Sequence, residues 1–260
     1  HKGRELYGLY EARQHNRQLE RVIIVEGYMD VVALAQHGIR CAVATLGTAS
    51  NSDHLRTAFR YCSEIVFCFD GDEAGRRAAQ RALENALPTM EDGRSIRFLF
   101  LAEGQDPDDT VRRIGGPGFE ALVAKSATLE SYFFDSFNDQ LDPDTMEGRA
   151  RLAKLATPLL SLLPDGVYKE LMIDELARRS GLSRPALDKL RESIPPPEHS
   201  NPPETPAPRP ARRTPESATL LEKLPAGKRD PGLFALAMLL YAPGDIASDI
   251  SALPPSDDNP

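Results

Sequence analysis

Cysteine is scarce in this sequence, and its placement argues against two classes of protein. The 260 residues include three cysteines, Cys41, Cys62 and Cys68, and no two of them form a C-x-x-C pair. A zinc ribbon needs such pairs, and a disulfide-stapled secreted domain needs an even set of spaced cysteines. Neither class is supported, and we expect a reduced, cytoplasmic protein.

Long apolar segments are also missing. No run approaches the roughly 20 apolar residues that a membrane-spanning helix needs. The first four residues are polar, whereas a signal peptide needs an apolar region. We therefore expect a soluble monomer with no membrane partner. Because the sequence begins at His1 and not at methionine, we also expect it to be a piece of a longer protein.

Basic residues are fewer than acidic ones. The chain has 31 Lys and Arg against 39 Asp and Glu, which gives a formal net charge of −8. A negative protein repels a phosphate backbone, so this charge taken alone argues against an enzyme that acts on nucleic acid. Hydrophobic residues make up 41% of the chain, which is ordinary for a globular protein, and the length allows two folded units.

Short apolar runs alternate with helical patterns between residues 21 and 124. The runs are β-branched or aromatic and nearly continuous in hydrophobicity, which is typical of strands buried on both faces. They lie at 22–25, 41–44, 65–69 and 96–101. Helical patterns lie at 28–37, 53–61, 73–86 and after Pro107. This order predicts an α/β fold with a mostly parallel sheet flanked by helices.

The pattern changes beyond residue 125. Residues 126–194 lack a continuous β-branched run and carry leucines at helical spacing, which predicts a small all-α subdomain. Nine of the 22 prolines fall in residues 195–215, so we predict an unfolded linker over 195–217. An apolar helix candidate at 233–241 indicates the start of a further domain over 218–260.

Acidic residues follow three of the four predicted strands. Glu26 follows the first, Asp70 and Asp72 follow the third with one glycine between them, and Asp106 and Asp108 follow the fourth. Because the carboxyl ends of parallel strands share one edge of a sheet, these residues are expected to converge. Clustered carboxylates repel one another unless cations are present, and hard divalent ions prefer oxygen ligands. The pattern predicts metal-dependent phosphate chemistry.

Each acid also has a structural explanation when it is taken alone. Asp72 can cap the helix predicted at 73–86, and Asp108 lies in an Asp-Pro-Asp-Asp string that is good capping chemistry before a helix. Capping explains single residues better than it explains acids at three strand ends. The joint pattern favours a site.

The acidic strings resemble the Toprim domain, whose mark is a Glu after the first strand and an Asp-x-Asp after a later one. The surrounding residues narrow the resemblance to bacterial DnaG-type primases. They read E-G-Y-M-D-V-V-A-L at 26–34, L-G-T-A at 46–49, F-D-G-D-E-A-G-R at 69–76 and Q-D-P-D at 105–108. The match covers most of residues 1–194, including the opening K-G-R-E-L-Y-G-L-Y string at 2–10.

The resemblance implies DNA-templated synthesis of RNA primers in chromosomal replication by two-metal nucleotidyl transfer. It implies two Mg²⁺ or Mn²⁺ ions as cofactors. Single-stranded DNA, ribonucleoside triphosphates and a DnaB-type replicative helicase are the implied partners, at the replication fork of the nucleoid. The implied principal acids are Glu26, Asp70 and Asp72, the further metal-binding acids are Asp30, Asp106 and Asp108, and the basic catalytic residue is Lys2.

The resemblance also implies parts that this sequence lacks. A primase has an N-terminal zinc ribbon, the only place where zinc is expected, and a basic subdomain that holds the template. We expect 1–20 to be the remnant of that basic subdomain, 21–125 the Toprim catalytic domain, 126–194 the helical subdomain and 218–260 the truncated start of the helicase-binding domain. If a basic part precedes His1 in the parent protein, as the resemblance implies, its absence here would account for the net charge of −8.

Other functions remain open at this point. A Toprim-type nuclease or topoisomerase uses the same acids for phosphodiester cleavage, although a covalent intermediate would need a separate tyrosine domain. A non-catalytic fragment that docks a helicase is a further alternative. A receiver-type or a haloacid-dehalogenase-type phosphotransfer domain also places acids at strand ends, but the latter expects a hydroxyl where this chain has Ala74.

Overall fold

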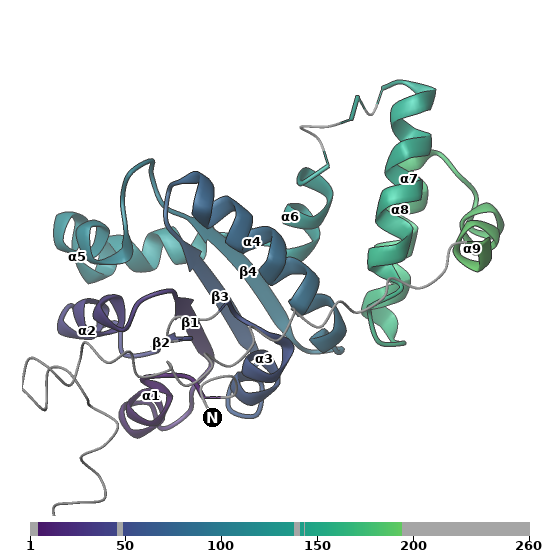
Figure 1. The fold of residues 1–260 in the computed structure, drawn as a ribbon. Coiled ribbons are helices and arrows are strands. Elements are labelled where there is room, and N and C mark those ends of the chain that lie inside the picture. Colours follow the sequence, from purple (N-terminus) through teal and green to yellow (C-terminus); the bar gives the residue numbers. More distant parts are fainter. Residues whose placement is uncertain (1–4, 46–48, 138–140, 143, 194–260) are drawn as a thin grey trace, which may run out of the picture. The chain divides into compact units, whose positions relative to one another are not determined.

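The computed structural model describes residues 5–45, 49–137, 141–142 and 144–193 (Figure 1). Lys2, the linker predicted over 195–217 and the segment 218–260 lie outside the described residues. Within the described residues, no helix has both the length and the apolar character needed to cross a membrane.

A five-stranded sheet with the order β2-β1-β3-β4-β5 forms the centre of the fold. Its strands are β1 (Arg21–Val25), β2 (Ala42–Ala44), β3 (Glu64–Phe69), β4 (Ser95–Phe100) and β5 (Ala127–Thr128). The first four are parallel, and β5 pairs antiparallel with β4. The predicted mostly parallel sheet is confirmed. Strand β5 is not predicted from the sequence, because two residues are too few to form a pattern.

Helices cover both faces of the sheet (Figure 1). In chain order they are α1 (Leu9–His15), α2 (Tyr28–Gln36), α3 (Ser52–Ala58), α4 (Glu73–Ala86), α5 (Pro107–Ala124), α6 (Leu129–Asp135), α7 (Met146–Leu160), α8 (Val167–Ser180) and α9 (Arg184–Ser193), with a 3-10 turn η1 at Leu87–Thr89. Alternate residues of β1 enter two cores: Val22 and Ile24 pack with α3 and α4, whereas Ile23 and Val25 pack with α2 and α5. A strand buried on both faces has the continuous hydrophobicity seen in the sequence.

The C-terminal ends of α2 and α3 can be compared with the ends predicted from the sequence. Helix α2 is followed by Gly38, whose positive φ of 90° suits glycine, in agreement with the predicted stop. The pattern at 53–61 predicts a longer α3 than is found. The α-helix stops at Ala58, and the next residues continue as turns in which the Tyr61 amide donates to the Ala58 carbonyl at 2.9 Å.

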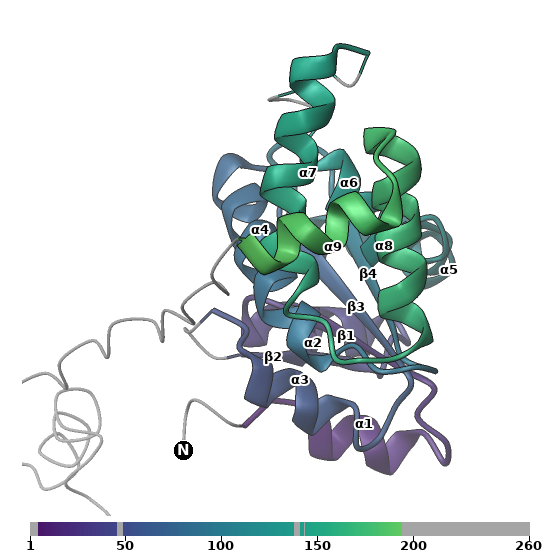
Figure 2. The same ribbon diagram turned by 90° about the vertical axis from the view of Figure 1, so that its right-hand side faces the viewer.

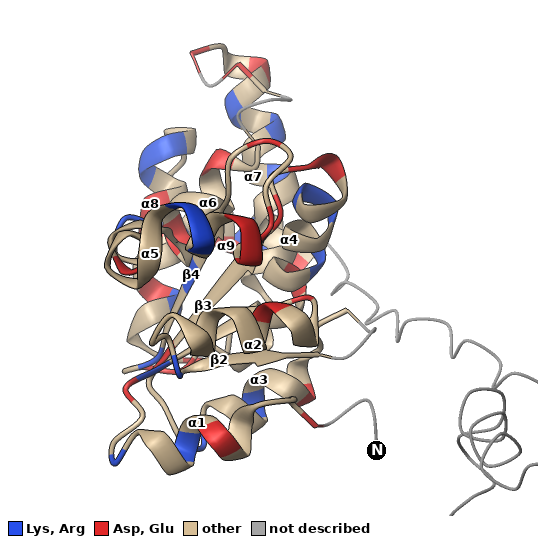
Figure 3. Ribbon diagram, turned by 90° about the vertical axis from the view of Figure 1, so that its left-hand side faces the viewer, with Lys and Arg blue, Asp and Glu red and all other residues tan. Residues whose placement is uncertain are grey.

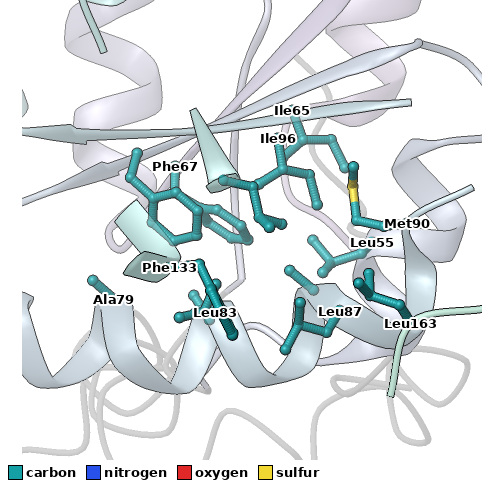
Figure 4. Close-up of a cluster of buried hydrophobic side chains, with 14 of the residues drawn as sticks. Leu55, Ile65, Phe67, Ala79, Leu83, Leu87, Met90, Ile96, Phe133 and Leu163 are labelled. Carbon is teal, nitrogen blue, oxygen red and sulfur yellow. The ribbon is translucent and has the colours of Figure 1, made fainter. Parts of the chain in front are cut away.

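The larger core lies between α4 and the sheet. It also includes side chains of helices α6, α7, α8 and α9. Figure 4 shows Phe67 of β3 and Phe133 of α6 close to Leu83 and Leu87, with Leu163 nearby. Phe67 and Phe133 are almost fully buried, and each such side chain contributes roughly 1.5–3 kcal/mol of hydrophobic stabilisation.

The all-α prediction for residues 126–194 is wrong at its start, where Ala127–Thr128 form β5, and the described residues that follow form helices α6 to α9 with no further strand. Helices α7, α8 and α9 contact one another (Figure 2) and bury Leu160, Leu176 and Leu187. A carboxylate outside this segment holds the start of α8: Asp92, in the turn before β4, accepts from the Val167 and Tyr168 amides at 3.0 and 2.9 Å. This contact satisfies two of the amides that a helix start leaves without a partner.

Candidate metal centre at the carboxyl edge of the sheet

Glu26 is the first residue after β1, and Asp70 is the first residue after β3. These two strands are parallel neighbours in the sheet. In the ladder between β1 and β3, Ile24 pairs with Phe67, so the strands end side by side at Val25 and Phe69. Strand β4 pairs with β3 up to Phe100, which brings the acidic segment after β4 to the same edge. The convergence predicted from strand order is therefore present in the fold.

Asp70 experiences the charge of the surrounding acids. It is half-buried, and burial is the first cause that raises the pKa of its carboxyl to about 6. Repulsion by Glu26, Asp30, Asp106 and Asp72, in decreasing order, adds to this rise in pKa. These acids are therefore close enough to act on one another. A bound cation would oppose both effects by favouring the ionised form of Asp70.

Asp30 lies in the first turn of α2 and interacts with acids of the same group. Its carboxylate accepts from the Gly27 amide at 3.2 Å, a contact that holds the start of the helix. Burial is the largest cause that raises the pKa of Asp30, the bond from Gly27 opposes the rise, and repulsion from Asp106 and Asp108 adds to it.

Two acids of the predicted site also cap helices. Asp72 is the N-cap of α4 and accepts from the Gly75 amide at 2.7 Å, so the structural explanation of Asp72 is correct for one of its oxygens. Asp106 is the N-cap of α5 and accepts from the Asp109 amide at 2.7 Å. Asp108 does not cap α5; it binds Arg112 one turn later. Capping and metal binding are compatible, because a carboxylate has two oxygens.

Glu26 and Asp70 make no hydrogen bond or ion pair with the part of the chain that the structure describes. Among the described residues, no three acidic, histidine or cysteine side chains stand together as a ready-made metal cluster. The donor chemistry nevertheless fits a hard divalent cation, since the site offers carboxylate oxygens under mutual repulsion, and Mg²⁺ keeps several water ligands of its own. Lys2 lies outside the described residues.

Glycines allow the acidic loops to pack against one another. A Cβ on Gly71 would lie 1.9 Å from the Ala102 carbonyl oxygen, and the Gly71 amide donates to the Gln105 carbonyl at 3.2 Å. A Cβ on Gly75 would lie 2.3 Å from the Asp70 carbonyl oxygen. Neither position has room for a side chain, so the loop that bears Asp70 is fixed between the first turn of α4 and the segment after β4.

A hollow of about 330 Å³ lies beside Glu26. Its polar lining includes Thr45, Ser50 and Arg81 of α4. Arg81 makes no ion pair with the described residues, whereas Arg77 on the same helix binds Glu73 at 2.7 Å. Figure 3 shows that α4 carries residues of both charges. The sequence does not single out Arg81, because an arginine on an exposed helix position has no distinguishing pattern.

Two family models match the chain. A model described as Toprim-like matches residues 23–111, which include all six acids of the predicted site. A model described as the DnaB-helicase binding domain of primase matches residues 131–184, from within α6 to the first residue of α9.

The chain is similar in sequence to bacterial DNA primases. A DNA primase of Pseudomonas aeruginosa is 53% identical over 198 residues, which cover 76% of this chain and 30% of that protein. A DNA primase of Escherichia coli is 50% identical over 182 residues, which cover 70% of this chain and 31% of that protein. The chain thus spans less than one third of the length of these relatives.

Solved structures give the same result. A DNA primase domain from Pseudomonas aeruginosa has a TM-score of 0.73 at 52% identity, with 74% of this chain and 60% of that chain covered. The Escherichia coli primase catalytic core has a TM-score of 0.67 at 50% identity, with 70% and 58% covered. A DnaG primase catalytic domain bound to single-stranded DNA has a TM-score of 0.67 at 50% identity, with 70% and 57% covered.

Proposed function

Since this chain belongs to the family of bacterial DnaG-type primases, we propose that it carries the catalytic centre for DNA-templated synthesis of RNA primers. The activity would be that of a nucleotidyltransferase, a DNA-directed RNA polymerase. The observation that carries this proposal is the convergence of Glu26 and Asp70 at one edge of a Toprim-like sheet, where Asp30, Asp72 and Asp106 raise the local negative charge.

We assign divalent metal binding to these acids. Glu26 and Asp70 are available as direct ligands, since no described residue engages their carboxylates. Asp72 offers its second oxygen while its first holds the start of α4. Asp30, Asp106 and Asp108 would complete the shell of a bound ion through water. Two Mg²⁺ or Mn²⁺ ions at such a site would lower the pKa of the attacking 3′-hydroxyl and neutralise the triphosphate.

The residues of the chain position the reactants. Asp72 and Asp106 are held by helix starts, so their carboxylates have fixed places, whereas Glu26 and Asp70 can adjust. The hollow beside Glu26 would receive the triphosphate, with Arg81 as a cationic contact. Lys2 is proposed as a further basic contact to the nucleotide, by resemblance alone. No side-chain nucleophile is needed in this reaction.

The partners follow from the same proposal. Single-stranded DNA would be the template and ribonucleoside triphosphates the substrates of a monomeric enzyme. We also propose contact with a DnaB-type replicative helicase. The match of residues 131–184 to a helicase-binding model supports that contact for the helical segment, and the resemblance suggests it for 218–260.

The comparisons do not favour a nuclease or topoisomerase, since the named relatives are primases. The same acids could nevertheless serve strand cleavage, so the test includes it. Primer synthesis and cleavage would be measured together on single-stranded DNA, with Mg²⁺ and Mn²⁺ titrated, for this chain and for its full-length parent. We expect metal-dependent primers and no cleavage products. Metal-dependent cleavage without primers would overturn the assignment.

The matched variants separate catalysis from folding. Asp70→Asn should abolish primer synthesis in the full-length parent while the fold persists, because the site loses a metal ligand and relieves a repulsion. Glu73→Gln, a change next to the site at an exposed residue whose one ion pair within the described part of the chain is with Arg77, should leave synthesis intact. We call the carboxyl edge of the sheet, with its six acids, the acidic edge; the acids are Glu26, Asp30, Asp70, Asp72, Asp106 and Asp108. Equal activity of both variants would show that the acidic edge does not hold the catalytic metal.

A further inference from the structure

Large apolar side chains are exposed beside the acidic edge, where burial would normally be expected. Tyr28 is 53% exposed and Met29 is 58% exposed at the start of α2, two and three residues after Glu26. Tyr7 is 40% exposed, and its ring meets the Tyr28 ring edge to face, with centroids 6.0 Å apart. Exposed aromatic groups of this kind often mark a binding surface.

The backbone holds the two tyrosines in place. Tyr7 forms an antiparallel bridge with Ala44, with hydrogen bonds of 2.9 and 3.0 Å, and Ala44 pairs in turn with Val25 of β1. Next to Tyr7, Gly8 has a φ of 82°, and a Cβ there would lie 2.9 Å from the Val31 side chain. This close approach brings the start of α1 against α2, so the aromatic pair is preorganised.

The position of the pair limits what can cover it. Ala44 ends β2 at the same edge of the sheet as Glu26 and Asp70. A protein partner seated on Tyr28 would also crowd Glu26 and Asp30, which the proposed metal chemistry needs accessible. A nucleotide with its phosphates at the carboxylates would instead bring its own flat, apolar base to the tyrosine rings. Aromatic side chains bind bases in this way with little dependence on sequence.

We propose that Tyr28, whose ring Tyr7 braces edge to face, forms a platform on which a nucleobase stacks while its phosphate group lies at the acidic edge. The inference rests on the proposed function and adds a base-binding site to it. The base could belong to the incoming nucleoside triphosphate or to the DNA template, and the chemistry of recognition is the same for both.

The test uses the absence of tryptophan from this sequence. In Tyr28→Trp the new residue is the sole tryptophan, and stacking of a base on it quenches its fluorescence. One series adds ATP with and without Mg²⁺, and another adds a single-stranded DNA oligonucleotide. The matched control is Tyr61→Trp, because Tyr61 is 38% exposed, lies just before β3 at the opposite edge of the sheet, and packs under Arg13.

We expect saturable quenching in Tyr28→Trp and none in Tyr61→Trp. Quenching by ATP that requires Mg²⁺ identifies the base of the incoming nucleotide, and quenching by the oligonucleotide identifies a template base. No quenching by either ligand would overturn the platform, and so would equal quenching of the two reporters. Primer synthesis by the wild-type parent is a separate measurement, so failure of the platform remains distinguishable from failure of the proposed function.

A second set of variants tests the ring itself. Tyr28→Leu should weaken binding of the ligand that quenches Tyr28→Trp by about 5- to 100-fold, the range expected for loss of one stacked base. Tyr28→Phe should bind within about twofold of wild type, because the ring and its stacking energy remain. If Leu and Phe weaken binding equally, the hydroxyl matters and not the ring, and the platform is wrong.

Discussion

Replacing Asp70 by asparagine should stabilise the metal-free protein and remove most of its response to Mg²⁺. In the wild type, burial and the neighbouring acids raise the pKa of Asp70 from an ordinary value of 3.8 to about 6. At roughly 1.4 kcal/mol per unit of pKa, this rise would correspond to about 3 kcal/mol of destabilisation above pH 6. Because Asp70 is only half-buried, solvent screening reduces the expected effect to about 1–2 kcal/mol.

The dependence on pH has a definite sign. The folded state holds the Asp70 proton more tightly than the unfolded state, so wild-type stability falls as the pH rises from about 4 through about 6. The asparagine amide in the variant does not titrate. The stability advantage of Asp70→Asn should therefore be near zero below pH 4 and complete above pH 6. Urea unfolding in the presence of a metal chelator, at several pH values, measures this difference directly.

Mg²⁺ should reverse the order of the two proteins. A ligand at 100 times its Kd stabilises the native state by about 2.7 kcal/mol, and the wild type should gain an increment of this kind. The asparagine variant should lose most of it, because a neutral amide is a poor ligand for a hard cation. A variant that keeps the full Mg²⁺ increment, or that is no more stable than wild type without metal at pH 7, would refute the reasoning.

Three further outcomes follow from contacts near the site. Asp72→Ala should cost roughly 1 kcal/mol in urea unfolding, because the N-cap of α4 is lost, while Asp72→Asn should cost little because the amide oxygen still accepts from Gly75. Gly75→Ala should destabilise the fold by about 1–3 kcal/mol, since the new Cβ has no room, whereas Ala74→Ser at the exposed neighbour should be neutral. Asp92→Ala should speed hydrogen exchange at the start of α8. The same loss of protection, measured relative to the intrinsic exchange rate at each pH, should appear in the wild type as the pH falls through the pKa of Asp92, which is lowered by the bonds from Tyr168 and Val167.

Sequence reasoning predicts the sheet and the acidic edge well, for a physical reason. Strands buried on both faces must be apolar throughout, so β1 and β3 are visible as short continuous runs. Parallel order then places whatever follows each strand at one edge, and this places Glu26 beside Asp70 without any knowledge of side-chain geometry.

The features that the sequence does not predict depend on contacts between distant segments. Tyr7 and Tyr28 meet because an antiparallel bridge ties Tyr7 to Ala44 and a parallel ladder ties Ala44 to β1. No local pattern encodes that sequence of contacts. The same is true of Asp92, which holds the start of a helix 75 residues later in the chain.

The acids at the edge differ in whether a hydrogen bond holds the carboxylate in place. Their asparagine variants should differ accordingly. Asp72 and Asp106 are tied to helix starts by hydrogen bonds of 2.7 Å, whereas Glu26 and Asp70 have no described partner to hold them. Because no described residue holds the carboxylates of Glu26 and Asp70, these two side chains can move toward a cation. Metal binding would then reorganise mainly Glu26 and Asp70. Asp72→Asn should therefore lose the Mg²⁺ increment without the metal-free gain expected for Asp70→Asn. If Asp72→Asn keeps the increment, Asp72 is a helix cap alone and the ligand set is smaller than proposed.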